Sequence, residues 1–135
     1  MNKILETLSK TEFLGVDNEF ATLKTRIAEN QLSIEPKMIT LTYVEYVVLM
    51  AALTHMEYIQ PMEEKEFWQV MRWTISYVGL NLPLSSNDTV TITISELEAY
   101  ILRQVIRYYR DISFDANGIF DISLTLLSKI DVTKF

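Results

Sequence analysis

The segment spanning residues 42–59 constrains the fold more than any other part of the sequence. Thr42 and Glu45 form the ends of a capping-box pattern, in which two side chains cap the first turn of a helix. From Tyr46 to Leu53 every residue is apolar or aromatic, so a helix here has no polar face to turn toward solvent. Such a helix is usually buried inside a bundle or an assembly. We therefore expect residues 42–59 to form the central helix of the fold.

Other segments show helical signals of different strength. Ser95 and Glu98 form a second capping box, which predicts a helix that runs to about Asp111. Residues 61–78 begin with a proline and are followed by a glycine, as is typical of a helix start and a helix end. The helical spacing of apolar residues is thinner over 18–32 and over 1–9. We therefore expect about four helices.

A smaller β element is indicated in the second half of the chain. Residues 89–94 alternate strictly between threonines and β-branched apolar residues, which predicts a short strand. A turn at 115–118 separates two apolar stretches and favours a hairpin over about 112–126. The predicted class is mainly α (α+β). It is a bundle of about four helices around the central helix at 42–59, with a small antiparallel β element from about 89–94 and 112–126.

The length and the ends of the sequence bear on its organisation. A chain of 135 residues suits one globular domain over 1–135. Apolar side chains at Ile130, Val132 and Phe135 predict that residues 128–135 form a C-terminal arm that packs on the domain or binds a partner. The first residues lack the apolar run of a secretion signal, and no apolar run approaches the roughly 20 residues that cross a bilayer. We expect a soluble protein without membrane contact, cytoplasmic or, if viral, part of the virion.

The sequence lacks the residue sets that most catalytic and metal sites require. It has no cysteine, His55 is its single histidine, and its three glycines are isolated, which excludes thiolate, multi-histidine and phosphate-loop sites. The turn at 115–118 resembles half of a calcium loop, but Leu124 stands where a bidentate glutamate is required. We expect no enzyme activity, no cofactor and no metal. A pair of carboxylates acting as acid and base stays open.

One side of the predicted helix at 61–78 points away from its core side. Met71 falls on the core side, whereas Val70, Trp73 and Tyr77 form a second stripe at i, i+3 and i+7. Large aromatic side chains often anchor protein interfaces, so this stripe is a candidate partner-binding surface. The alternative is that the stripe packs inside the same domain, because helices of a bundle often bury two sides.

The helix predicted from Ser95 carries a basic strip opposite its apolar face. The strip consists of Arg103, Arg107 and Arg110, with Tyr100 beside them. No acid lies three or four residues before these arginines, so no such ion pair within the helix is expected. The arginines are instead expected to be solvated, to bind nucleic-acid phosphate, or to pair with an acidic stretch of this or a neighbouring chain. That acidic stretch, at 57–66, contains Glu63, Glu64 and Glu66. Nucleic acid is not the expected partner, since the net charge is −6.

These features favour a protein that acts by binding other proteins. We expect a non-enzymatic structural, assembly or adaptor subunit of a larger complex, such as a viral particle, that forms a homo-oligomer or joins an assembly. The acidic stretch and the basic strip complement each other and permit head-to-tail contacts. The alternative is a small acidic inhibitor or immunity-type protein that blocks a basic site on a target, which the net charge of −6 supports.

Overall fold

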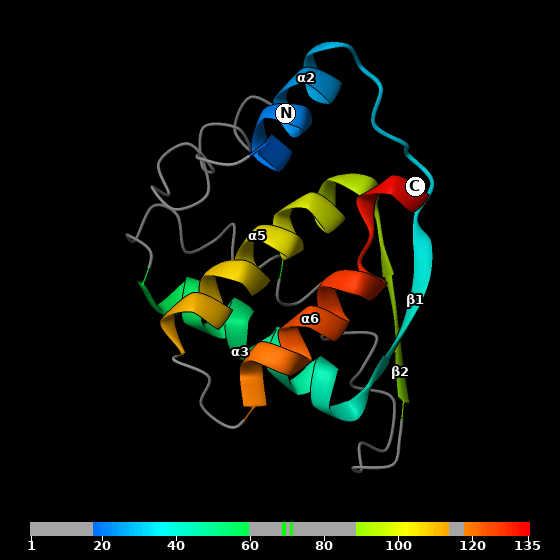
Figure 1. The fold of residues 1–135 in the computed structure, drawn as a ribbon. Helices are drawn as coiled ribbons and strands as arrows, with labels where there is room; N and C mark the ends of the chain where they lie inside the picture. Colours follow the sequence, from blue (N-terminus) through cyan, green and yellow to red (C-terminus); the bar gives the residue numbers. More distant parts are fainter. Residues whose placement is uncertain (1–17, 60–68, 70, 72–88, 114–117) are drawn as a thin grey trace.

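The computed structural model describes residues 18–59, 69, 71, 89–113 and 118–135 (Figure 1). Within this part of the chain the elements are α2 (Asn18–Ala28), β1 (Lys37–Thr42), α3 (Tyr43–Ile59), β2 (Thr89–Ile94), α5 (Glu96–Ile112), α6 (Ile119–Lys129) and the 3-10 helix η3 (Val132–Lys134). The predicted class, mainly helical with a small antiparallel sheet, is confirmed. The helix predicted over 1–9 lies outside the described residues, as does the one over 61–78 except at two helical positions.

The two long helices α3 and α5 begin where their capping boxes predict. At α3, the backbone N–H of Thr42 donates to the Glu45 carboxylate at 2.8 Å, and the N–H of Glu45 donates to the Thr42 hydroxyl at 3.2 Å. At α5, Ser95 and Glu98 exchange the same two hydrogen bonds, at 2.9 and 3.2 Å. The first N–H groups of a helix have no partner within the helix, and each capping box supplies side-chain acceptors at this point. Each helix can therefore begin directly after the strand that precedes it.

The strands β1 and β2 pair antiparallel, with Lys37 opposite Ile94 at one end of the sheet. The apolar side chains that alternate along both strands point into the core and are fully buried, namely Leu41, Val90, Ile92 and Ile94. The strand predicted over 89–94 is confirmed. The partner strand predicted within 112–126 is wrong, because its place in the sheet is taken by β1.

Most of the stretch predicted as the second hairpin strand forms the helix α6 instead. Its core-facing side chains are Ile119, Ile122, Ser123 and Leu126. A strand would have turned Phe120 and Leu124 to the core together with Ile122, yet these two side chains are 46% and 47% exposed. The helical face packs against both α3 and α5, and this packing outweighs the weak alternation of the sequence. Gly118 has a φ of 72°, a left-handed conformation that glycine adopts freely, and α6 begins directly after it.

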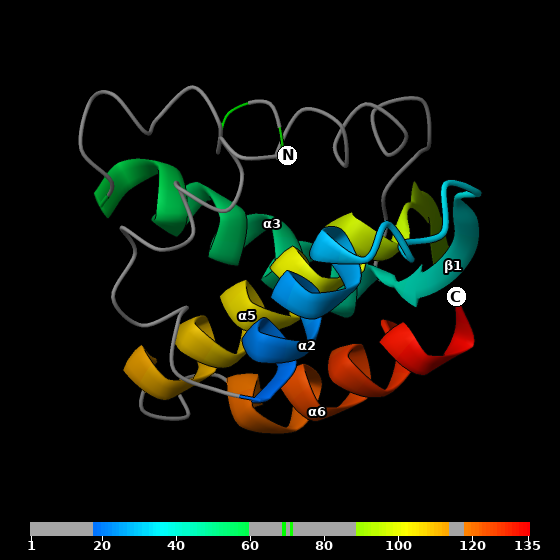
Figure 2. The ribbon, with the colours of Figure 1, turned by 90° about the horizontal axis from the view of Figure 1, so that it is seen from above.

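α5 lies in the middle of the described elements. α2, α3 and α6 pack around it, and the sheet stands at one end (Figures 1 and 2). Seen from above, α2 lies over α5 (Figure 2). α3, predicted to be central, contributes six residues to the same core cluster. One of its sides is partly exposed, and α5 and α6 pack on others.

The helix α2 ends earlier than the predicted range of 18–32. Asn30 has a positive φ of 55°, and its backbone N–H donates to the carbonyl of Ile27 at 3.1 Å. The N–H of Gln31 donates to the carbonyl of Arg26 at 2.8 Å. This pair of bonds is a Schellman motif, which closes a helix by pairing its last carbonyl groups.

The predicted C-terminal arm at 128–135 packs on the core. Ile130 is fully buried, and Val132 and Phe135 pack against the core cluster. Asp131 caps η3 by accepting hydrogen bonds from the hydroxyl and the N–H of Thr133, at 2.7 and 2.9 Å. These bonds lower the pKa of Asp131. The arm therefore takes the first of its two predicted roles, and partner binding by the arm stays a prediction.

Candidate protein-binding site

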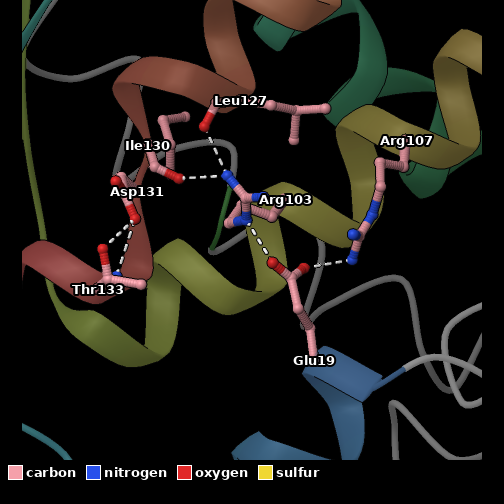
Figure 3. Close-up of polar contacts among 7 residues, drawn as sticks. All are labelled: Glu19, Arg103, Arg107, Leu127, Ile130, Asp131 and Thr133. Atoms are coloured by element: carbon pink, nitrogen blue, oxygen red, sulfur yellow. Dashed lines mark hydrogen bonds and ion pairs between the residues drawn. The ribbon is translucent and has the colours of Figure 1, made fainter.

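Two arginines of the predicted basic strip meet on one carboxylate inside the chain. Arg103 Nε donates to one oxygen of Glu19 at 2.7 Å, and Arg107 Nη2 donates to the other (Figure 3). Nη1 of Arg103 also donates to the carbonyl oxygens of Leu127 and Ile130, the latter at 2.8 Å. A cation suits this position because the last carbonyl groups of a helix lack partners. These arginines therefore hold both α2 and α6 against α5.

The partner of Arg103 and Arg107 is none of those predicted for the basic strip, which were solvent, nucleic-acid phosphate and the acidic stretch at 57–66. Glu19 lies 84 residues from Arg103 along the chain, and no local pattern connects the two residues. The side chains of Arg103 and Arg107 are 17% and 26% exposed. Both guanidinium groups are engaged inside the chain, so they do not form the free basic surface that the sequence suggested.

A second ion pair joins α2 and α5 at the opposite end. Arg26 of α2 forms a bidentate pair with Glu96 of α5, and Glu96 Oε1 also accepts from the N–H of Ser33 at 3.0 Å. The hydrogen bond to Glu96 raises the pKa of Arg26. Residue 26 meets residue 96 whereas Glu19 meets Arg103, so α2 and α5 run in opposite directions.

Tyr100 lies on α5 between these two ion pairs. It is 4% exposed, and Leu23 on the facing side of α2 is 1% exposed. The prediction that Tyr100 belongs to an exposed strip is therefore wrong, because α2 covers this side of α5. Burial raises the pKa of the Tyr100 hydroxyl, and the nearby carboxylate of Glu96 raises it further. Tyr100 is a core residue in this structure, and its predicted role in a protein interface stays a prediction.

Arg110 differs from the other two arginines of the strip. Its Nε donates to the carboxylate of Asp111 at 3.2 Å, and the side chain of Asp111 is 69% exposed. The Arg110 guanidinium also lies over the ring of Phe120, 5.5 Å from the centroid. Contacts of this exposed kind contribute little to stability.

The remaining predicted interface residues lie outside the described part of the chain. They are Val70, Trp73, Tyr77, Glu63, Glu64 and Glu66. Met71, predicted for the core side of the same helix, is 7% exposed and belongs to the core, as expected. The partner-binding roles of the Trp73 stripe and of the acidic stretch stay predictions.

An apolar stripe on α3 faces outward. Val44 and Val47 are 45% and 44% exposed, and Tyr58 is 81% exposed. Ala51 and His55, which lie between them, are partly exposed. Steps of three and four residues place all five side chains on one side of the helix. We call these five residues the α3 stripe, and it is a side of α3 that the other described elements leave partly exposed.

The α3 stripe borders a groove between α3 and α6. Two adjoining hollows of about 270 and 380 Å³ share Val44 and Ile122 in their walls. The first hollow has mainly apolar walls, formed by Val44, Val47, Val48 and Ala51 of α3, Tyr109 of α5, and Ile119 and Ile122 of α6. The second hollow adds Glu45, Asp121 and Lys129. We call the two hollows together the α3–α6 groove.

A buried ion pair lines one end of this groove. Glu45 is 3% exposed, and its Oε1 accepts hydrogen bonds from Lys129 Nζ and from the backbone N–H of Thr42. Burial raises the pKa of Glu45, but hydrogen bonds from Lys129, Thr42 and Thr125 together lower it by more, so the pKa lies below its ordinary value of 4.5. The pair ties the last turn of α6 to the first turn of α3.

The lowered pKa of Glu45 predicts an acid-sensitive contribution to stability. The folded chain holds the ionised carboxylate more strongly than the unfolded chain, so this contribution is present above pH 4.5 and is lost as the pH falls through the folded pKa. We expect Glu45→Gln and Lys129→Met each to reduce the fall in the urea midpoint between neutral pH and acid. The prediction is wrong if both variants keep the full acid sensitivity of the parent protein.

The described residues were compared with the requirements of a metal site and of a histidine held by hydrogen bonds. Among them, no three His, Cys, Asp or Glu side chains gather closely enough to hold a metal ion. Nε2 of His55 is buried and accepts or donates no hydrogen bond within the described part of the chain. The rings of Tyr108 and Tyr109 lie 5.9 and 6.0 Å from the His55 ring.

Comparison with protein-family models, with curated proteins and with solved structures finds no match. None of the described helices is both long enough and apolar enough to cross a membrane.

The α3 stripe was not among the residues predicted for an interface. The run from Tyr46 to Leu53 is apolar at every position, so periodicity within it does not separate the core side from the outer side. The other wall of the groove was missed because α6 was predicted as a strand. The spacing of Ile119, Ile122 and Leu126, at i, i+3 and i+7, was the signal for a helical wall.

Proposed function

We propose that the protein is a non-enzymatic assembly or adaptor subunit that binds an amphipathic helix of a partner protein in the α3–α6 groove. The observation that carries this proposal is the α3 stripe, in which Val44 and Val47 are nearly half exposed beside mainly apolar walls. Contiguous exposed apolar surface of this kind marks interaction sites. Amphipathic helices bind such grooves through side chains at i, i+3 or i+4, and i+7.

The dimensions and the charge of the site define the partner helix. From Val44 to Tyr58 the α3 axis rises by roughly 21 Å, which matches a partner helix of about four turns. Asp121 lines the groove and forms no ion pair with another described residue. The net charge of the chain is −6. These charges favour a partner helix that carries lysine or arginine beside its apolar stripe, and they disfavour a second copy of this chain as the occupant.

The proposal predicts binding of a simple model helix. The probe is a leucine–lysine peptide of about 14 residues, with leucines at i, i+3, i+4 and i+7. We expect the backbone resonances of Val44, Val47 and Ile122 to shift on titration, as measured by NMR of the isotope-labelled protein. The double variant Val44→Gln, Val47→Gln should bind the peptide at least about tenfold more weakly, because it removes the apolar contact and retains the charge.

Two controls separate groove binding from general attraction between opposite charges. A peptide of the same composition, scrambled so that its leucines surround the helix, should bind at least about tenfold more weakly. Ala21→Gln introduces the same polar side chain at an exposed position of α2 and should leave affinity unchanged. Equal binding of both peptides, or resonance shifts confined to other surfaces, contradicts the proposal. So does a stable dimer of the free protein that the double Val→Gln variant dissociates, since a second copy then occupies the groove.

A further inference from the structure

The strand β1 has one edge that pairs with β2 and one edge that no strand of the described part of the chain covers. An uncovered edge presents a row of backbone N–H and C=O groups without strand partners. Such an edge is the starting point for strand addition, in which an extended peptide joins the sheet through main-chain hydrogen bonds. β1 therefore has the backbone groups that a third strand requires.

A groove of about 470 Å³ runs along this edge of β1. One wall is formed by four consecutive residues, 37–40, and the other by residues of the C-terminal arm. Consecutive residues of a strand point to opposite faces of the sheet, so a wall that includes all four runs along the edge of the backbone. No residue of β2 lines the groove, which places it on the uncovered side of β1. Four residues of extended chain span roughly 10 to 13 Å, enough for a short strand.

The charge of the groove is basic, in contrast to the chain as a whole. Lys37 and Lys134 line it and supply this charge, whereas Lys129, which also lines it, is paired with Glu45. Asp131 also lines it, but its carboxylate is directed to the N–H and hydroxyl of Thr133. The Lys37 ammonium donates to the Lys134 carbonyl, and an ammonium group has three N–H donors, so further donors remain for a ligand. The net charge of −6 matters less at this range, because salt screens exposed charges beyond about 8 Å.

An apolar side chain lies at the same edge. Met38 is 75% exposed and lines the groove, and Ile34, in the segment that leads into β1, is 93% exposed. Methionine adapts its shape to varied partners and is common at binding surfaces. The groove therefore offers backbone hydrogen bonds, positive charge and one adaptable apolar contact to the same ligand.

We propose that this β1-edge groove binds an extended acidic segment of a partner protein, which adds to β1 as a third strand. The site is separate from the helix-binding role of the α3–α6 groove, although Lys129 stands between the two. A second copy of this chain is not the occupant, because its own β1 strand, Lys37–Thr42, carries no acidic side chain to meet these lysines. Lysine on an edge strand protects against such self-pairing, whereas an acidic strand is attracted to it.

The test uses a fluorescein-labelled peptide of about seven residues that alternates valine and glutamate, with binding followed by fluorescence anisotropy. We expect saturable binding that weakens as salt is added. The double variant Lys37→Glu, Lys134→Glu should bind about tenfold or more weakly, since it reverses the charge of the groove. Methylation of alternate backbone nitrogens of the peptide should abolish binding, because it removes the N–H groups that pair with β1.

The controls decide between strand addition and simple charge attraction. Lys24→Glu reverses one charge at an exposed position of α2 and is the matched control for Lys37→Glu alone. Its affinity should stay within about twofold of the parent protein. The proposal is overturned if the methylated peptide binds as well as the parent peptide, or if Lys24→Glu weakens binding as much as Lys37→Glu alone. Circular dichroism of each variant confirms that the fold is retained.

Discussion

Replacing Leu53 with alanine is expected to lower the free energy of unfolding by roughly 2 to 5 kcal/mol. Leu53 is fully buried on the core side of α3, so the change removes apolar contact and leaves a cavity that the surrounding helices fill only in part. Domains of this size usually unfold at a cost of about 5 to 15 kcal/mol, so the loss is a large fraction of the total. Denaturant unfolding followed by circular dichroism measures the effect.

Two substitutions on the same helix serve as controls for Leu53→Ala. Val47→Ala shortens an apolar residue that is 44% exposed, and it should cost less than about 1 kcal/mol. Thr54→Ala changes the exposed neighbour of Leu53 and should stay within about 0.5 kcal/mol of the parent protein. If Val47→Ala costs as much as Leu53→Ala, then the α3 stripe belongs to the core and the helix-binding proposal loses its basis.

Arg103→Met is expected to destabilise the protein by about 2 to 4 kcal/mol. The guanidinium of Arg103 meets the carboxylate of Glu19 and the carbonyl oxygens of Leu127 and Ile130. Methionine keeps much of the apolar stem but leaves the two carbonyl groups without this donor. The same unfolding measurement reports the loss, and helix content before unfolding shows whether α2 and α6 persist.

Arg110→Met is the matched control for Arg103→Met, since it makes the same change on the same helix. Arg110 contacts exposed Asp111 and the ring of Phe120, so its loss should cost less than about 1 kcal/mol. A double-mutant cycle of Arg103→Met with Glu19→Gln should give a coupling energy of at least about 0.5 kcal/mol, because the two side chains are in contact. Equal losses in the two arginine variants, together with zero coupling, contradict the assigned role of Arg103.

The elements that the sequence predicts well are those encoded by neighbouring residues. Thr42 with Glu45, and Ser95 with Glu98, pair across a single turn, and both helices begin where these pairs predict. The strict alternation over 89–94 likewise identified β2. In each case the deciding interaction lies within a few residues, so the local pattern contains it.

The strand that pairs with β2 could not be predicted from neighbouring residues. β1 is a short run behind Pro36, and nothing in its own residues indicates which later strand it joins. The turn at 115–118 suggested a nearer partner for β2, because a turn between apolar stretches commonly closes a hairpin. α6 forms instead because its apolar face packs against two helices at once.

The candidate site was predictable only in its general character. The apolar nature of α3 indicated that it meets other elements on several sides, but not that Val44 and Val47 stay exposed. The arginine strip was recognised as basic, whereas its acid, Glu19, lies far away along the chain. Both outcomes depend on how the helices pack, which a single sequence leaves open.

The separation of the two strands also has a consequence for the order of synthesis. β1 ends at Thr42, and its first partner in the register, Thr89, is made only after all of α3 and the connection that follows. At about 5 to 20 residues per second, β1 leaves the ribosome roughly 2 to 10 seconds before β2. During that interval both edges of the new strand are open to other nascent chains. Its lysine and its alternating threonines therefore protect the unfinished protein from premature association before they take their places in the sheet.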